Sequence, residues 1–308
     1  MAKKRRSLAE LLRGVYADDD GYDPADNASK CYDLAVSTLR EKLESFRCER
    51  IGPHKLYLGD CTKIMPLLGS VDAVVTDPPY GNSNHDGDYN ASLNAHRGIK
   101  DQPIANDDQD SMRTVVDAML TQAVGLLGKE ASACCCFCGG GGPKPQFAWL
   151  AERMDREGLQ FFHSLIWDKR NPGLGQRYRR QHEMILVAHR KGGRIRWNGD
   201  DRLVPNVLSQ MPPRERDHPN EKPVELMQKL VATHSNERDT ILDPFMGSGT
   251  TGVACVRLGR RFVGIEMDLG HFETACRRIT EATKQPDMFV SSPKPENSPT
   301  QADLLETP

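Results

Sequence analysis

Short apolar runs and helical stripes of apolar residues alternate along the middle of the chain. Strands are predicted where β-branched or other apolar residues run together, at residues 54–58, 71–75, 134–138, 161–167, 184–188, 240–242 and 262–266. Helices are predicted where apolar residues recur at helical spacing, at residues 31–47, 111–127, 147–157 and 271–282, with further helices opening near 223 and 250. Strands that alternate with helices are typical of an α/β fold built on a parallel sheet.

The two ends of the chain are polar. Residues 1–50 are expected to form a polar arm with a helix over 31–47, whose expected core contacts are Leu34, Leu39, Leu43 and Phe46. Residues 284–308 carry prolines among polar residues and are expected to be a disordered tail. The basic stretch at residues 3–6 has no apolar run behind it, so we expect neither a secretory signal nor a membrane span, and we expect a cytoplasmic protein.

A local basic segment is the candidate surface for nucleic acid. The net charge of the 308-residue chain is −2, so no overall field attracts a polyanion. Between residues 169 and 202, however, ten lysines and arginines stand against three acids. The candidates for phosphate contact are Lys169, Arg170, Arg177, Arg179, Arg180, Arg194 and Arg196. A solvated basic loop is the alternative, and the predicted strand at 184–188 requires some of these arginines to flank the sheet.

Four of the nine cysteines fall in the run Cys134-Cys135-Cys136-Phe137-Cys138. Zinc sites usually pair cysteines two residues apart in a turn and take further ligands from elsewhere. This run instead lies between small residues and a glycine turn, so we expect a buried core strand of reduced thiols and no metal site.

The strand at 71–75 leads into the run Thr76-Asp77-Pro78-Pro79-Tyr80-Gly81. Ligands bind at the carboxyl ends of strands in open α/β sheets. Asp77 and the carbonyl of Pro78 could accept the two N–H groups of an exocyclic amino group on a nucleobase, and Tyr80 could stack on that base. The alternative is a plain strand-to-loop turn, because Asp-Pro is a common turn opener. Residues 81–110 show no sustained period and are expected to form a mobile lid or DNA-contacting loop.

A second candidate site is the strand, glycine turn and helix at residues 240–251. Its turn reads Asp243-Pro244-Phe245-Met246-Gly247-Ser248-Gly249-Thr250. Glycines let the backbone approach a ligand closely, and N–H groups at a helix start can bind polar ligand groups. Glu266 ends the next predicted strand about 20 residues later, which is the place of an acid that binds a ribose diol in nucleotide-type folds.

Together, these blocks resemble the S-adenosylmethionine-dependent DNA amino-methyltransferases, over roughly residues 52–283. The Asp77 block comes first, the basic middle follows, then residues 218–226, and the glycine turn comes last, an order similar to the β group of that family. The resemblance implies a single doubly wound, mostly parallel sheet of the Rossmann-like methyltransferase fold, with permuted motif order. A catalytic half would span residues 51–168 and a cofactor-binding half residues 218–283, with a small inserted target-recognition region at 169–217.

The same resemblance implies roles for individual residues. The catalytic residues would be Asp77, Pro78, Pro79 and Tyr80. The cofactor adenine would lie near Asp60, and its ribose hydroxyls would bind Glu266. The methionine part would lie on Asp243, Pro244, Phe245, Gly247, Ser248, Gly249 and Thr250, with Lys222 and Pro223 beside the pocket.

The activity implied by this resemblance is direct transfer of a methyl group from S-adenosylmethionine to an exocyclic amino group of a flipped base in double-stranded DNA. Adenine N6 is the first choice of target, because Asp opens the Asp77 block, and cytosine N4 is the alternative. An RNA methyltransferase and a non-catalytic DNA-binding homologue are the remaining alternatives. A homodimer and a partner restriction endonuclease stay open.

Overall fold

The computed structural model describes residues 36–81, 108–139, 146–172, 179, 181–199, 204–213 and 221–284. Its strands are β1 (Cys48–Ile51), β2 (His54–Leu58), β3 (Ala73–Thr76), β4 (Ala131–Cys138), β5 (Leu159–Asp168), β6 (His182–Arg190), β7 (Arg194–Ile195), β8 (Val207–Ser209), β9 (Thr240–Asp243) and β10 (Arg261–Glu266). Its helices are α3 (Cys61–Ile64), η1 (Met65–Leu67, a 3-10 turn), α5 (Gln109–Leu126), α6 (Gln146–Glu157), α7 (Val224–His234), α8 (Thr250–Arg257) and α9 (Leu269–Lys284).

One mixed sheet joins all these strands in the order β1-β2-β10-β9-β3-β4-β6-β5-β8, with β7 beside β4. The central run β2, β10, β9, β3 and β4 is parallel. Antiparallel pairing occurs where β6 joins β4 and β5, and where β1 joins β2. The prediction of a mostly parallel α/β sheet is therefore confirmed, and so is the prediction that the basic segment contributes a core strand, which is β6.

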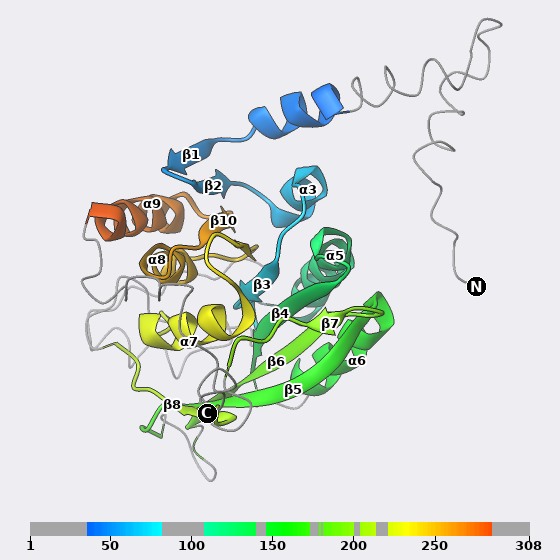
Figure 1. Cartoon of the computed structure of the whole chain (residues 1–308), viewed down its shortest axis with the longest axis vertical. Coiled ribbons are helices and arrows are strands. Elements are labelled where there is room, and N and C mark those ends of the chain that lie inside the picture. Colours follow the sequence, from blue (N-terminus) through cyan, green and yellow to red (C-terminus); the bar gives the residue numbers. More distant parts are fainter. Residues whose placement is uncertain are drawn as a thin grey trace, which may run out of the picture.

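Helices cover both faces of the sheet (Figure 1). Leu226 of α7, Val253 of α8 and Phe272 of α9 belong to one buried cluster. Ile64 of α3, Met119 of α5 and Leu150 of α6 belong to the other. This arrangement confirms the doubly wound prediction, because each face of the sheet is buried by its own set of helices.

The cysteine run forms a core strand, as predicted. Side chains of β4 alternate between the two clusters, with Cys135 on the face of Phe137 and Cys134, Cys136 and Cys138 on the other. Burial raises the pKa of the Cys134 and Cys138 thiols to about 12, so both stay protonated at neutral pH. Within the described ranges no three metal-ligating side chains gather.

The structure differs from the prediction at Leu39 and at two strands that were not predicted, β1 and β8. Residues 36–44 are helical, but Leu39 is 45% exposed and is not a core contact. Leu43, in the last turn of this helix, and Phe46, just after it, pack against the core. The strand β1 was not predicted, because Cys48–Ile51 carries two charged residues. No strand was predicted within residues 203–217, but β8 lies there and pairs with β5.

Several predicted segments lie outside the described residues. They are Leu34 and the start of the polar arm, residues 82–107 of the loop at 81–110, residues 218–220 of the block at 218–226, and the tail at 285–308. Among the described helices, none is long and apolar enough to cross a bilayer.

The packing of α8 on α9 yields a test of the fold. A Cβ at Gly252 would lie 2.3 Å from Ile279 Cδ1 and 2.9 Å from Phe262 Cδ1, so G252A is expected to lower the free energy of unfolding by about 1–3 kcal/mol. A Cβ at Gly125 of α5 meets nothing within 4 Å, so the matched variant G125A is expected to raise that free energy by up to about 1 kcal/mol. Urea unfolding of both variants checks this, and equal stabilities would contradict the packing of α8.

Candidate active site

Neighbouring strands bring the two candidate sites to the same edge of the sheet. Strand β3 pairs in parallel with β9, with Ala73 opposite Ile241 and Val74 opposite Leu242. Asp77 follows directly after β3, and the glycine turn follows directly after β9. Because parallel strands end at the same edge, segments 166 residues apart in sequence (Asp77 and Asp243) emerge side by side.

The carboxylate of Asp243 joins the two segments. Its Oδ1 accepts hydrogen bonds from Thr76 Oγ1 at 2.7 Å and from the N–H of Phe245 at 3.1 Å, and its Oδ2 accepts one from Thr251 Oγ1 at 2.6 Å. Asp243 is buried, and burial raises the pKa of its carboxyl to about 6, against the effect of these hydrogen bonds. These hydrogen bonds fix the turn against the end of β3, and the predicted contact of Asp243 with a cofactor stays a prediction.

The two glycines of the turn have different surroundings. Gly247 has a φ of 51° and Gly249 a φ of 81°, a region that favours glycine. A Cβ at Gly249 would lie 2.8 Å from Ala275 Cβ, whereas a Cβ at Gly247 would meet nothing within 4 Å. Gly249 therefore serves the packing of the turn on α9, and Gly247 leaves its backbone open to the approach of a ligand.

Glu266 ends β10 beside this turn. Its carboxylate accepts the N–H groups of Gly247 at 2.9 Å, Met267 at 2.9 Å and Asp268 at 2.8 Å. Burial raises the pKa of Glu266, and these N–H groups oppose the shift. The backbone carbonyl of Glu266 accepts from the N–H of Gly59 at 2.8 Å, and this bond holds the turn that follows β2 beside the end of β10. Glu266 and the turn at Gly247, both predicted to contact the cofactor, therefore meet directly.

Asp60 follows Gly59 and caps α3. Its Oδ1 accepts from the N–H of Thr62 at 2.9 Å and from Thr62 Oγ1 at 2.7 Å. Since β2 pairs in parallel with β10, Asp60 lies at the same sheet edge as Glu266. The structure thus places Asp60, Glu266 and the glycine turn along one edge, and their contact with a cofactor stays a prediction.

Arg278 of α9 supports the glycine turn and was not foreseen from the sequence. Its Nη1 donates to Ser248 O at 2.9 Å, to Ser248 Oγ at 2.7 Å and to Thr250 Oγ1 at 3.3 Å. Its Nη2 donates to Glu221 Oε1 at 2.5 Å. The sequence offered one signal, an arginine next to the buried positions Ala275 and Ile279 of an amphipathic helix.

Beside the end of β3 lies a group of polar and charged side chains, here called the Asp77 cluster, in which Lys222 is buried and the others are half-buried: Asp77, Tyr80, Lys169, Glu183 and Lys222. The Tyr80 hydroxyl lies 2.7 Å from Asp77 Oδ1 and 3.0 Å from Glu183 Oε2. Lys222 Nζ donates to Asp77 Oδ2 and lies 3.2 Å from Glu183 Oε2. Lys169 Nζ donates to Glu183 Oε1 at 2.9 Å.

The charges of the Asp77 cluster balance, and the pKa values of its two carboxyls are shifted in opposite directions. Burial raises the pKa of Asp77, although the Lys222 ammonium opposes this. Burial also acts against the charge of Glu183, but the ammonium groups of Lys222 and Lys169 together lower the pKa of Glu183 to about 2. Burial disfavours the charge of Lys222 too, yet Asp77 and Glu183 raise its pKa. Glu183 is therefore held firmly ionised, and Asp77 is closer to accepting a proton.

Aromatic rings surround the Lys222 ammonium. Its Nζ lies 5.5 Å from the ring centre of Tyr80, 5.3 Å from that of Phe137 and 5.8 Å from that of Trp167. Lys222 was predicted to lie beside the cofactor pocket, and its ammonium contacts Asp77 and Glu183. Pro223, predicted with it, precedes α7, and its carbonyl accepts from the N–H of Leu226 at 3.1 Å.

A buried glutamine fixes the prolines of the corner and was also missed. Gln146 Nε2 donates to Pro79 O at 3.0 Å, and Gln146 Oε1 accepts from the N–H of Gly139 at 2.9 Å. In the described part of the chain no donor reaches the Pro78 carbonyl. That carbonyl is the second acceptor that the sequence predicted for an amino group.

The residues predicted to contact DNA lie in different regions of the structure. Lys169 lies in the Asp77 cluster, Arg170 is exposed beside it, and Arg179 donates to Pro172 O at 3.1 Å. Arg177 and Arg180 lie outside the described residues. Arg194 pairs with Ala131 at the amino end of β4, with Arg196 next to it, whereas Thr76 pairs with Cys136 near the other end of that strand. Arg194 and Arg196 therefore lie away from Asp77, and their contact with DNA stays a prediction.

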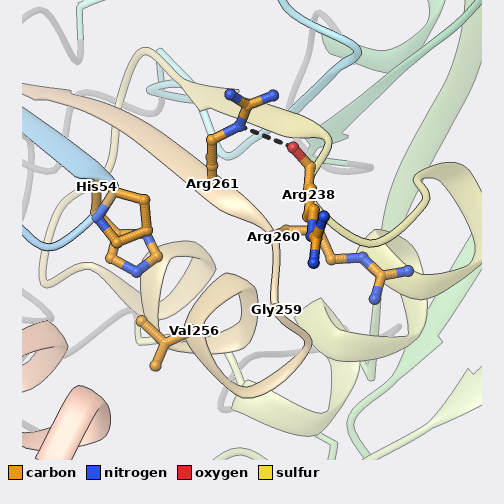
Figure 2. A pocket seen from close by; sticks show the side chains of 7 residues that line it. His54, Arg238, Val256, Gly259, Arg260 and Arg261 are labelled. Carbon is orange, nitrogen blue, oxygen red and sulfur yellow. Dashed lines mark hydrogen bonds between the residues drawn. The ribbon is translucent and has the colours of Figure 1, made fainter. Parts of the chain in front are cut away.

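A hollow of about 400 Å³ lies at the opposite edge of the sheet, by the amino ends of β2 and β10. Figure 2 shows His54, Arg238, Arg260 and Arg261 around it, with Arg261 Nε donating to the Arg238 carbonyl at 2.8 Å. The Arg260 guanidinium donates to the carbonyls of Leu258 and Ser235. This hollow is therefore separate from the candidate active site, and its most buried arginine is engaged within the fold.

Known proteins resemble this chain in sequence and fold. A family model described as DNA methylase, of the N6/N4 type, matches residues 71–277. Type II methyltransferase M2.MboI of Moraxella bovis is 27% identical over 249 residues, which cover 74% of this chain and 88% of that protein. Type II methyltransferase M2.DpnII of Streptococcus pneumoniae is 32% identical over 143 residues, which cover 41% of this chain and 53% of that protein.

Two solved structures share the fold. The M1.HpyAVI–SAM complex has a TM-score of 0.55 and 27% identity, with 73% of this chain and 98% of that chain covered. The PvuII DNA methyltransferase, described as cytosine-N4-specific, has a TM-score of 0.57 and 16% identity, with 75% and 91% covered. The second likeness concerns the fold alone.

The buried carboxyl of Asp243 predicts a pH-dependent stability. Its pKa of about 6 lies above the unfolded value, so its contribution to stability is present at low pH and is lost as pH rises through about 6. Relative to D243N, the wild type is expected to lose at most about 3 kcal/mol of unfolding free energy between pH 4 and pH 7. Urea unfolding across this range tests it. Asp72, whose carboxylate accepts from the N–H of Thr240 at 2.8 Å, supplies the matched control D72N. Parallel pH curves for wild type and D243N would contradict the raised pKa of Asp243 in the folded protein.

Proposed function

Since this chain belongs to the DNA methylase family of the N6/N4 type, we propose that it transfers a methyl group from S-adenosylmethionine to an exocyclic amino nitrogen of a flipped base in double-stranded DNA. One observation carries this proposal. The acidic corner at Asp77 and the open glycine turn at Gly247 meet at one sheet edge, joined by the hydrogen bonds of Asp243.

The residues at this edge suit the cofactor. The open side of Gly247 leaves space for the methionine part, and Glu266 offers a carboxylate for ribose hydroxyls. Asp60, at the same edge, would lie near the adenine. When bound, S-adenosylmethionine supplies an electrophilic methyl group attached to a sulfonium.

The protein's own residues would orient the amino nitrogen. Its lone pair is delocalised into the base, so it is a weak nucleophile. Asp77 and the Pro78 carbonyl accept its two N–H groups, which favours a pyramidal nitrogen with an available lone pair. Tyr80 stacks on the flipped base, with its hydroxyl anchored on Asp77 and Glu183. Asp77, whose pKa burial raises, then accepts the proton that the methylated nitrogen loses.

Adenine N6 is the target we propose, because an aspartate opens the motif at residues 77–80. Cytosine N4 is the second candidate, since the same two acceptors fit its amino group. A homodimer and a partner endonuclease stay predictions.

The catalytic role of Asp77 has a direct test. D77A is expected to lower the rate of labelled-methyl transfer to unmethylated DNA by about 10²- to 10³-fold, because one acceptor for the amino group is lost. Binding of S-adenosylhomocysteine is expected to persist, since Glu183 still pairs with Lys222. Asp110, exposed on α5, supplies the control D110A. Near-normal turnover by D77A would reject this role.

The target atom is settled by the product. Nucleoside mass spectrometry of DNA from cells expressing the protein is expected to show N6-methyladenine, absent with D77A. N4-methylcytosine in its place would make the second candidate correct, and methyl transfer to RNA but not DNA would refute both.

A further inference from the structure

Glu183 shares both hydrogen-bonding partners of Asp77. The Tyr80 hydroxyl lies within hydrogen-bonding distance of both carboxylates, and Lys222 Nζ contacts both as well. Glu183 comes from β6, 103 positions along the chain from Tyr80. It is 17% exposed in its side chain, and Lys169 holds its other oxygen.

A buried ammonium with one carboxylate partner would bind that carboxylate tightly. An opposite charge in a site of low dielectric is strongly attracted, and leaving it unpaired is costly. If Asp77 were the single partner of Lys222, turning Asp77 toward a substrate amino group would leave the Lys222 charge unpaired. The second carboxylate removes this obstacle, because Lys222 keeps a partner throughout.

We propose that Glu183 is a positioning residue of the methyl-transfer site, which keeps the Lys222 ammonium and the Tyr80 hydroxyl in place while Asp77 engages the amino group of the target base. The inference rests on the proposed function. Glu183 itself does not touch the base; it acts through Tyr80 and Lys222.

The ionisation of the two carboxyls agrees with this division of roles. Lys222 and Lys169 keep the pKa of Glu183 low, so it stays ionised when Asp77 takes up a proton. The negative charge of Glu183 also raises the pKa of Asp77. Removing that charge should therefore lower the pKa of Asp77. The titratable groups that face Asp77 are Lys222, Glu183, Tyr80, Cys136, Cys138 and Asp243.

The test compares E183Q with wild type across pH. E183Q is expected to lower kcat by about tenfold to a hundredfold, because Asp77 stays paired with Lys222 and the base is misplaced. The acid limb of its kcat/KM profile is expected to move to lower pH, a change that a merely structural role would not produce. Binding of S-adenosylhomocysteine should be unchanged.

Glu157 provides a matched control. It is a carboxylate of similar exposure, 18%, paired with Arg153 on α6. E157Q makes the same chemical change outside the Asp77 cluster, and its kcat and pH profile are expected to follow wild type.

Each outcome decides the question. A wild-type protein without methyl transfer refutes the proposed function, whereas an active wild type whose profile overlays that of E183Q refutes the role of Glu183 alone. If E183Q does not fold, E183D is measured instead; it keeps the charge, so it should keep the wild-type acid limb with a lower kcat. A shifted acid limb in E183D would overturn the proposal.

Discussion

The hydrogen bonds of one buried carboxylate, Asp243, tie the two halves of the site together. Asp243 ends β9, and Thr76, the residue before Asp77, donates to it from the end of β3. Thr251, at the start of α8, donates to its other oxygen. A buried carboxylate is costly unless such donors surround it, so the strand end, the glycine turn and the helix start must all keep their places. This constraint fixes the position of the Asp77 corner relative to the glycine turn.

The Asp77 cluster is a second group of polar side chains, mostly half-buried, and it has a different role. Its members come from four separate segments: the end of β3, the end of β5, the start of β6 and the chain before α7. Two carboxylates and two ammonium groups balance each other, so the cluster is neutral while remaining rich in donors and acceptors. The hydrogen bonds of Asp243 thus hold the backbone segments in fixed positions, whereas the hydrogen bonds of the Asp77 cluster can be exchanged.

Sequence reasoning succeeded where the pattern is local. The apolar run before Asp77, the glycine turn after β9 and the cysteine strand are each readable within about ten residues, and the structure has strands or turns at all three. It failed where a short element depends on its partner, as with β8, which is three residues long and exists through pairing with β5. It also failed at Leu39, because helical spacing does not show whether a sheet lies against the helix.

The supporting residues of the site were beyond prediction for a physical reason. Glu183 meets Tyr80 across 103 positions, Gln146 meets Pro79 across 67 and Arg278 meets Glu221 across 57. No spacing in one chain shows such contacts; they follow from the order of strands in the sheet. Lys222 illustrates the same limit, since the family resemblance placed it beside the cofactor pocket but did not show its contacts with Asp77 and Glu183.

A crystal structure with bound S-adenosylhomocysteine tests the central claim most directly, namely that the Asp77 corner and the turn at Gly247 form one site. The account predicts that the ribose lies against Glu266, the homocysteine part against Gly247, and the sulfur on the side of Asp77. A cofactor bound elsewhere, such as the hollow near His54, or a sulfur directed away from Asp77, would contradict it.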